Sequence, residues 1–344
     1  MTKMLSEISE QPAVLKTIYE KNKTVIKEIA AELKKRGIKH FVFAARGTSD
    51  HAGTYAKYLL GICGGYTCAL AVPSAITLYG ADFDFSEECV VGVSQSGKAA
   101  DALEVISACN EDGGVTVAVT NDCSSPMARI AKYHLDCSAG PELSVAATKT
   151  FTAEMMLLAH LAAELCGNEA LKEALLSVWE QSGEVIDKVF PAIEKEAARY
   201  TFVEDGFVLG RGIIYPVALE TALKIQETCY VKMKGYPSSD FYHGPIAQVD
   251  RRSFVIILAP EGKAFKDAEA MAEQIAAKEA ELLVFTNNED LAAKYRSVLL
   301  PKCDELAAPF VFAPAIQYFA QCLSLSKGLD PDNPRGLKKV TITK

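Results

Sequence analysis

A short polar segment follows an apolar run in the first third of the chain. The run Val90–Val93 is followed directly by Ser94, Gln95, Ser96 and Gly97. Two hydroxyls, an amide and a glycine that lets the backbone approach a ligand can surround a phosphate with donors. A helix that begins there adds free backbone N–H groups and a positive dipole end. The segment predicts a phosphate site, although serine is also a common helix cap.

A second polar segment follows an earlier apolar run, HFVFAA at 40–45. Gly47, Thr48 and Ser49 lie at its end, before a helical pattern that starts near Ser49. Taken alone, an ordinary helix cap explains this turn as well. Because ligands of open parallel sheets bind beyond the carboxyl ends of the strands, two hydroxyl-rich strand ends favour one shared binding site.

The segment ALETALKIQET (218–228) has a helical pattern and carries three ionisable side chains. Glu220, Lys224 and Glu227 are four and three residues apart, so they lie on one helical face. A solvent-exposed ion pair is the ordinary explanation of such a set. The helix follows the Gly-Arg-Gly end of a strand, where active sites of α/β proteins lie, and a carboxylate beside an amine suits proton transfer next to a carbonyl.

Two further segments carry groups suited to sugar chemistry. His243 lies in a turn-rich loop, YPSSDFYHGP (236–245), and a histidine near neutral pH can shuttle the proton that opens a sugar ring. The tail 330–344 contains Lys338 and Lys339 before a strand-like VTIT, and a lysine amine can form an imine with an open-chain sugar. A surface histidine and a frayed terminus are the alternatives.

The elements that position these residues occur twice. β-rich runs alternate with helical patterns, which predicts parallel sheets with helices on both faces. Gly212 of FVLGRG corresponds to Gly47 of FVFAARG, and Gly262 corresponds to Gly97 at the same offset along the chain. We therefore expect two α/β domains of one duplicated fold. The second copy of the serine turn, APEGKAF (259–265), has no serine, so the turn itself does not require the hydroxyls.

The composition excludes several classes of protein. The chain has 344 residues, 49% apolar and 23% charged, which suits two packed domains and not disorder. The net charge of −8 with no Lys/Arg-rich run argues against nucleic acid and anionic membranes as partners. Ten scattered cysteines without a Cys-x-x-Cys pair and five dispersed histidines indicate a cytoplasmic protein with reduced thiols and no metal site. No signal peptide or membrane span is expected.

On six stretches the chain resembles the sugar isomerase (SIS) domain family. It is most similar to the isomerase half of glucosamine-6-phosphate synthase and to stand-alone glucosamine-6-phosphate deaminases. The stretches are GTSDHAG (47–53), VSQSGKAAD (93–101), GPELSVAATKTFTAE (140–154), GRGIIYPVALETALKIQET (210–228), FYHGPIAQVD (241–250) and DPDNPRGLKKV (330–340).

The resemblance implies an α/β fold of two tandem SIS domains. Each would be a parallel five-stranded sheet flanked by helices, in a flavodoxin-like three-layer arrangement. The implied divisions are an N-terminal helix 1–36, a first SIS domain 37–165, a helical connection 166–200, a second SIS domain 201–329 and a closing tail 330–344.

The resemblance also implies residue roles and partners. The implied contacts of a sugar 6-phosphate are Gly47, Thr48, Ser49, Ser94, Gln95, Ser96, Val145, Ala147 and Glu220. The implied catalytic residues are Glu227 for the C1–C2 proton transfer, Lys224 for the oxyanion, His243 for ring opening and Lys339 as Schiff-base lysine, with Lys338 left open beside it. Since this histidine typically serves the neighbouring subunit, a homodimer with shared sites follows, with no metal or organic cofactor.

The chain also departs from the synthase pattern. Position 2 is Thr2 instead of the cysteine nucleophile, and the first SIS pattern begins near residue 38, so no glutaminase is expected. Ala99 and Ala147 replace two synthase hydroxyls, which is more similar to the deaminases. We expect conversion of glucosamine 6-phosphate to fructose 6-phosphate and ammonia. Galactosamine 6-phosphate deamination, fructosamine 6-phosphate deglycation, plain aldose/ketose isomerisation and a non-catalytic sugar-phosphate sensor remain alternatives.

Overall fold

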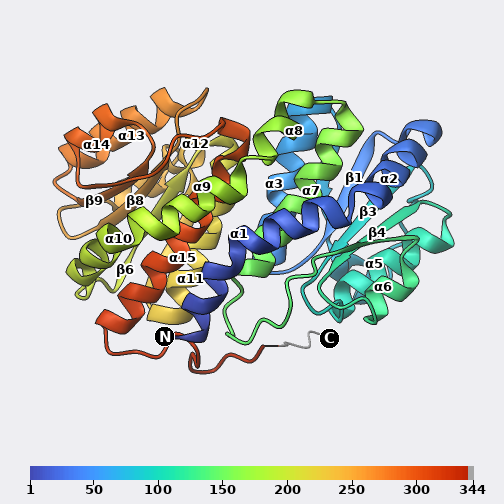
Figure 1. The fold of residues 1–344 in the computed structure, drawn as a ribbon, viewed down its shortest axis with the longest axis horizontal. Coiled ribbons are helices and arrows are strands. Elements are labelled where there is room, and N and C mark those ends of the chain that lie inside the picture. Colours follow the sequence, from blue (N-terminus) through green and yellow to red (C-terminus); the bar gives the residue numbers. More distant parts are fainter. Residues whose placement is uncertain (340–344) are drawn as a thin grey trace. The chain divides into compact units, whose positions relative to one another are not determined.

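A computed structural model describes residues 1–339 and contains two parallel five-stranded sheets (Figure 1). The first sheet has the order β2-β1-β3-β4-β5, with β1 His40–Ala44, β2 Thr67–Leu70, β3 Glu88–Val93, β4 Val115–Thr120 and β5 Tyr133–Asp136. The second has the order β10-β9-β8-β6-β7, with β6 Asp205–Gly210, β7 Lys232–Pro237, β8 Phe254–Ala259, β9 Glu281–Thr286 and β10 Ser297–Leu299.

The two sheets have the same topology. Read from its other edge, the second sheet runs β7-β6-β8-β9-β10, which repeats the first order strand for strand. The register repeats too: Phe43 pairs with Leu70 in the first sheet, and Val208 pairs with Gly235 at the corresponding positions of the second. The duplicated α/β fold predicted from the sequence is confirmed.

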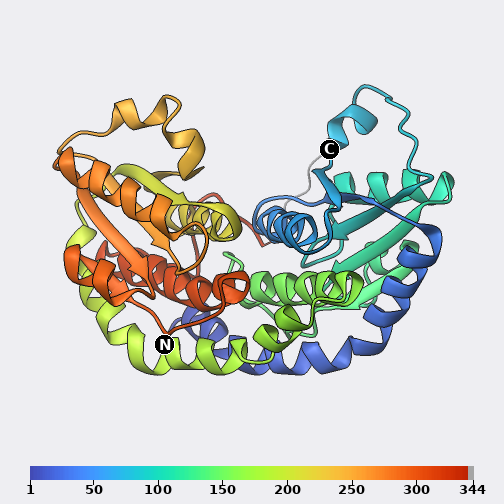
Figure 2. The same ribbon diagram turned by 90° about the horizontal axis from the view of Figure 1, so that it is seen from above.

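Helices cover both faces of each sheet (Figures 1 and 2). The helices before β6 are α1 Lys3–Lys21, α2 Lys23–Arg36, α3 Thr48–Gly64, α4 Pro73–Thr77, α5 Ala100–Glu111, α6 Pro126–Ile130, α7 Lys149–Cys166, α8 Glu169–Leu175, α9 Val178–Glu184, the π-helix η1 Val185–Val189, α10 Phe190–Ala197 and the 3₁₀ turn η2 Ala198–Tyr200. After β6 they are η3 Gly212–Ile214, α11 Tyr215–Cys229, α12 Ser238–Phe241, η4 Pro245–Gln248, α13 Phe265–Ala277, α14 Glu289–Lys294, η5 Glu305–Ala307 and α15 Ala308–Ser326.

Alternate residues of the buried strands pack on opposite faces of the sheet. In the second sheet, Leu209 and Ile257 pack with Met271 of α13 on one face. Val208 and Ile256 pack with α11 and α15 on the other face. Such three-layer packing explains why the central strands are nearly continuous runs of apolar residues.

The N-terminal segment 1–36 forms two helices where the sequence analysis expects one. The helix is interrupted at Asn22, between α1 and α2. The buried Asn22 amide donates to the carbonyls of Ile18 and Asp136 and accepts from the Asp136 N–H. This side chain bonds both the end of α1 and the edge strand β5, which explains the break.

The chain divides into two compact units, each built around one sheet. The first-sheet unit contains Ala13–Glu142 and Lys149–Leu176, with Lys338 and Lys339 of the tail. The second-sheet unit contains Met1–Pro12, Leu143–Thr148 and Ser177–Leu337. The boundaries expected at residues 36, 165, 200 and 329 stay a prediction.

Two expectations from the composition, reduced cysteines and no membrane span, can be compared with the structure. None of the ten cysteines, all within residues 1–339, forms a disulfide, and Cys89, Cys109, Cys137, Cys229 and Cys322 are buried. Within residues 1–339, one helix, Glu305–Ser326, is long and apolar enough to cross a membrane, but 94% of its most apolar window is buried inside the protein. Such burial is typical of a core helix.

Candidate active site

The two hydroxyl-rich turns meet at one edge of the first sheet. β1 and β3 are hydrogen-bonded neighbours, so Gly47–Ser49 and Ser94–Ser96 both lie beyond their carboxyl ends. Ser94 is buried with 8% exposure, and Gln95 and Ser96 beside it are both half-buried. The Ser94 N–H donates to the Val119 carbonyl at 3.0 Å, which fixes the turn on β4. The predicted phosphate-binding residues are therefore grouped, as the sequence analysis expects.

Gly97 has a packing role in addition to the expected one. Its φ of 61° is a left-handed conformation, and a Cβ placed on it would clash with the side chain of Ser125. Ser125 caps α6 through a hydrogen bond from Ala128 N–H. The close approach to the cap of α6 therefore requires a glycine here, and the expected approach of this backbone to a ligand stays a prediction.

Charged residues beside these turns were missed by the sequence analysis. Arg46 precedes Gly47, and its Nη2 lies 2.6 Å from Oδ2 of Asp101 in the first turn of α5. Ser49 Oγ donates to Glu154 Oε1 of α7 at 2.9 Å. Arg46 stays 54% exposed, so it adds a positive charge next to the predicted phosphate position. The position of Arg46 inside the polar turn ARGTS is the sequence feature that could have indicated this residue.

The Glu-Lys-Glu face of α11 is buried, not solvated. Lys224 and Glu220 have fully buried side chains, and Glu227 is 22% exposed. Lys224 Nζ lies 3.3 Å from Glu220 Oε1 and 2.5 Å from Glu227 Oε2. Burial opposes the charge of Lys224, but the two carboxylates raise its pKa well above the ordinary value. Lys224 is therefore an ammonium that can stabilise an anion, and the solvent-exposed explanation of this trio is wrong.

Glu227 opens into a cavity of about 290 Å³ within the second-sheet unit. Tyr230 and Arg335 line this cavity with Glu227, and Leu223, Gln226 and Leu337 complete the wall. The Arg335 guanidinium lies 4.1 Å from the centre of the Tyr230 ring, and the backbone N–H of Arg335 donates to the Tyr230 hydroxyl at 2.7 Å. Tyr230 has a φ of 57°, a left-handed conformation that no sequence pattern indicated.

His243 lies in an exposed turn after α12. Its backbone N–H donates to the Asp240 carbonyl at 3.0 Å. His243 is not among the residues that line the Glu227 cavity. The structure thus places the two predicted proton-transfer groups in one unit but does not bring them into one cavity.

The tail distinguishes the two candidate lysines. Lys339 Nζ lies 2.8 Å from Oε2 of Glu142, whose side chain is fully buried, whereas Lys338 is exposed. The same Oε2 accepts from Thr150 Oγ1 at 2.8 Å. Glu142 was quoted in a motif but given no role by the sequence analysis. The VTIT segment that was expected to be strand-like lies outside the described residues.

Val145 and Ala147 lie in a segment, Leu143–Thr148, that the N-terminal helix holds. The carboxylate of buried Glu7 accepts hydrogen bonds from Ser144, through both its backbone N–H and its hydroxyl. The Gln317 amide accepts from Gln11 Nε2 at 2.6 Å and donates to the Thr148 carbonyl at 3.2 Å. This segment therefore belongs to the second-sheet unit, together with Glu220.

The chain belongs to the SIS domain family, whose model matches residues 10–164 and 205–321. It is 33% identical to a glutamine–fructose-6-phosphate aminotransferase of Aquifex aeolicus, over 99% of this chain and 57% of that protein. The chain thus spans little more than half of that relative's length.

Solved structures agree with this assignment. A protein provisionally described as a phosphosugar isomerase, from Silicibacter pomeroyi DSS-3, has a TM-score of 0.88 at 30% identity, covering 96% of this chain and 100% of that chain. The C-terminal domain of the glucosamine-fructose-6-phosphate aminotransferase from Francisella tularensis has a TM-score of 0.87 at 26% identity, covering 97% and 98%.

Proposed function

We propose that the chain is a phosphosugar isomerase that acts as an amino-sugar 6-phosphate deaminase. The observation that carries the proposal is the Glu220–Lys224–Glu227 trio, in which Glu227 alone is partly exposed and lines a cavity. A partly exposed carboxylate beside a buried ammonium can accept a proton next to a carbonyl while the ammonium stabilises the oxyanion that forms. The substrate we infer is glucosamine 6-phosphate.

The proposed reaction uses only proton transfers and water. His243 moves the anomeric proton and opens the ring to an aldehyde with an amine on C2. Glu227 removes the C2 proton and returns it to C1, which converts the amino aldehyde into a ketimine. Water then adds to C2 and ammonia leaves, so glucosamine 6-phosphate and water give fructose 6-phosphate and ammonia. The phosphate would be held by Ser49, Ser94 and Ser96, with Thr48 and Gln95 beside them.

The role of Lys339 in this reaction depends on whether its amine can lose a proton. An ammonium paired with a carboxylate has no lone pair for attack, so imine formation by Lys339 requires prior transfer of a proton to Glu142. The 2.8 Å contact between these groups permits such a transfer. Lys338 is exposed, and we therefore favour Lys339 as the lysine of the tail that serves the site.

A homodimer with shared active sites is part of the proposal. His243 is exposed and lines no part of the Glu227 cavity, which supports a role in the site of a neighbouring chain. Mixing inactive His243→Ala and Glu227→Gln chains should restore part of the activity through hybrid sites. Mixtures as inactive as the parents would show that each site is built from one chain. The scattered free cysteines support a cytoplasmic location.

The decisive experiment is an ammonia-release assay with a panel of phosphosugars. We expect the purified chain to release ammonia from glucosamine 6-phosphate and to form fructose 6-phosphate, with Glu227→Gln as the inactive control. Release from galactosamine 6-phosphate instead would change the substrate and keep the reaction. If the chain interconverts plain aldose and ketose phosphates without releasing ammonia, or cleaves fructosamine 6-phosphate, that activity would replace deamination as the proposed function. Binding without turnover of any sugar would indicate a sensor.

A further inference from the structure

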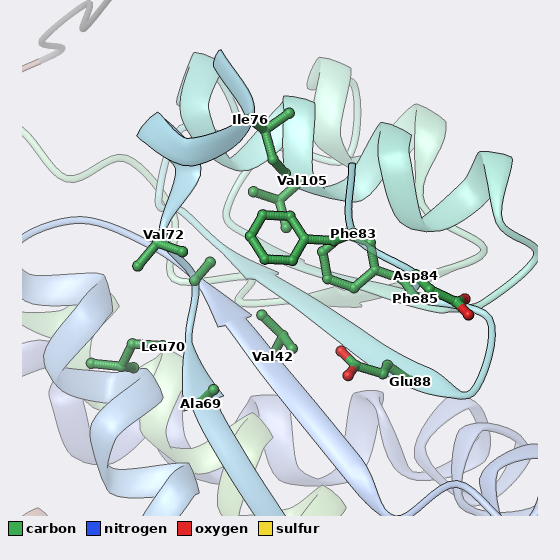
Figure 3. Close-up of a pocket in the computed structure, with 11 residues that line it drawn as sticks. Val42, Ala69, Leu70, Val72, Ile76, Phe83, Asp84, Phe85, Glu88 and Val105 are labelled. Atoms are coloured by element: carbon green, nitrogen blue, oxygen red, sulfur yellow. The ribbon is translucent and has the colours of Figure 1, made fainter. Parts of the chain in front are cut away.

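A second cavity lies in the first-sheet unit, away from the hydroxyl-rich turns. Its volume is about 220 Å³, and it opens on the face of the sheet where β1 and β2 meet α4 and α5 (Figure 3). Nine of its lining residues are apolar: Val42, Ala69, Leu70, Ala71, Val72, Ile76, Phe83, Phe85 and Val105. The other two, Asp84 and Glu88, are acidic. The predicted phosphosugar residues are not among those that line it.

The corresponding place in the second sheet is filled with aromatic rings. Phe207 of β6 lies 5.1 Å from Phe241 of α12 and 6.2 Å from Tyr236 of β7, measured between ring centroids. Phe241 is fully buried. The corresponding positions of the first copy, in the same strand register, are Val42, Ala71 and Ile76, and all three line the cavity. The first copy thus has no aromatic side chain at these three positions, and the cavity lies there.

The cavity is a half-open pocket and not an enclosed void, because Val72 and Phe83 at its mouth are exposed. A cavity of roughly 150 Å³ lined by apolar residues is enough to hold one benzene. The cavity of about 220 Å³ therefore has room for one ring and a short side chain.

The charged residues that line the cavity indicate which charge its ligand carries. The carboxylate of Glu88, the first residue of β3, points back toward Val42 beneath the rings of Phe83 and Phe85 (Figure 3). Burial raises the pKa of this half-buried carboxyl, and the nearby His40 opposes the shift without cancelling it. Asp84 lies at the outer edge, held by a hydrogen bond from the Ser86 N–H at 2.9 Å. Two carboxylates repel a sugar phosphate, and they attract a cation.

The aromatic residues favour the same kind of ligand. Phe83 is 39% exposed and Val72 is 61% exposed, so both lie at the mouth of the cavity. A cation near the face of a phenyl ring is attracted by its π electrons. An apolar group can then fill the space between Val42, Ile76 and Val105, as aromatic rings do in the second sheet.

We propose that this cavity binds a small amine that carries a single apolar ring, with the ring among the aliphatic residues and the ammonium at Glu88. This ligand is neither substrate nor product of the proposed reaction. The site requires both features of the first copy, the missing aromatic volume and the carboxylate at the start of β3.

Direct binding of a probe tests the proposal. The complete chain is titrated with 2-phenylethylamine in a calorimeter, with 2-phenylethanol as a neutral control of nearly the same shape. We expect saturable binding of the amine at one site per chain, and affinity for the alcohol at least about tenfold lower, because a charged hydrogen bond is lost. Equal affinity for both probes, or no saturation by the amine, would overturn the proposal.

Two substitutions separate the ring from the charge. Ile76→Phe repeats the residue at position 241 and fills the cavity, so affinity for the amine should fall at least about tenfold. Glu88→Gln should weaken the amine about tenfold and leave the alcohol unchanged. Leu299→Phe, an exposed apolar position in the second sheet, is the matched control and should bind the amine normally.

The remaining outcomes of this experiment also support or overturn the proposal. Circular dichroism checks that each variant is folded, and Ala71→Leu replaces Ile76→Phe if the latter is not. Unchanged amine affinity in a folded filled variant would overturn the proposal. If the wild type does not bind the amine and the Val72→Asp substitution changes the oligomeric mass, a second copy covers the cavity. This result would overturn the proposal as well.

Discussion

Equivalent positions of α3 and α11 carry different chemistry on the same backbone arrangement. Both helices follow the first strand of their sheet, and α11 presents Glu220, Lys224 and Glu227. The corresponding positions of α3 are Tyr55, Leu59 and Ile62, none of which is charged. At these three positions, only the second copy has groups that can move a proton.

The turns after β3 and β8 show the opposite distribution. Ser94 and Ser96 follow β3, whereas Ala259 and Glu261 occupy the equivalent places after β8. Glu261 pairs with Lys302 at 2.7 Å, so its turn already holds an internal anion. One copy has hydroxyls at its strand ends and the other has the Glu-Lys-Glu helical face, which supports the proposed division between anion binding and proton transfer.

The largest expected effect is on the catalytic helix of the second copy. Glu227→Gln keeps the shape of the side chain but removes the base, so kcat should fall by about 10²–10⁴-fold with little change in KM. Exchange of the substrate C2 hydrogen with solvent deuterium, followed by NMR, should fall in parallel. Lys224→Met should slow turnover and leave a residual exchange.

The control for this prediction is Glu289→Gln, an exposed glutamate on α14 of the same unit, which should retain wild-type kcat. Exchange at the wild-type rate in Glu227→Gln would remove Glu227 as the base. Glu220 on the same helical face would then be the first alternative.

The next effect concerns the hydroxyls of the first copy. Ser94→Ala with Ser96→Ala should raise KM for a sugar 6-phosphate by about 10–100-fold, because hydrogen bonds to a charged group are lost. The fold should survive, since the turn is held by backbone bonds to Val119 and Asn121. Steady-state kinetics measures the change. Glu261→Ala, at the place equivalent to Ser96, should leave KM unchanged, and an equal rise in both variants would end the distinction between the copies.

A smaller effect is expected from opening the filled position of the second copy. Phe241→Ile introduces the residue that the first copy has at position 76 and removes contacts with Phe207 and Tyr236. The loss of ring packing should lower the free energy of unfolding by about 1–2 kcal/mol. Urea denaturation followed by circular dichroism measures it. No loss would mean that the aromatic trio contributes nothing that the first copy lacks.

The smallest expected effect is an acid sensitivity confined to the first sheet. Burial opposes ionisation of Asp136, but hydrogen bonds from Lys21 and Ser138 lower its pKa to about 2. Because the folded pKa lies below the ordinary 3.8, the stabilisation is present above about pH 4 and is lost as the pH falls toward 2.

Leu299, which pairs with Thr286 as Asp136 pairs with Thr120, occupies the equivalent place in the second copy, so no matching carboxylate exists there. Asp136→Asn should therefore lower stability by about 1 kcal/mol at pH 6 and by almost nothing at pH 2. Thermal melts across this range test it. A deficit that stays the same at pH 2 would assign the effect to packing instead of charge.

Sequence patterns predicted the elements of this fold well because the buried parallel strands are nearly pure apolar runs. The constant offset between the matching segments predicted the second sheet from the sequence alone. The break at Asn22 was not predictable, because its cause is a hydrogen bond with Asp136, 114 residues away. The boundaries of the compact units follow such long-range contacts, which leave no local pattern.

The candidate site was predictable where its residues form local patterns. The serine turn and the Glu-Lys-Glu spacing are visible in the sequence, but burial of Lys224 is not, because the same spacing describes a solvated helix. Glu142 gives no local signal, since its partner Lys339 lies 197 residues later. Arg335 was inside a quoted motif, and only its packing on Tyr230 indicates a role beside Glu227.

The start of α1 depends on a residue that the ribosome adds much later. The free N–H groups of Lys3 and Met4 donate to the carboxylate of Asp332 at 2.7 and 2.9 Å, which caps the helix from far along the sequence. Met4 and Ile8 belong to the core of the second-sheet unit, so their apolar surface has no native partners while the polypeptide is being made. During synthesis the segment Met1–Pro12 must therefore wait for the second sheet, and it is a segment on which a chaperone that guards nascent chains would be expected to act.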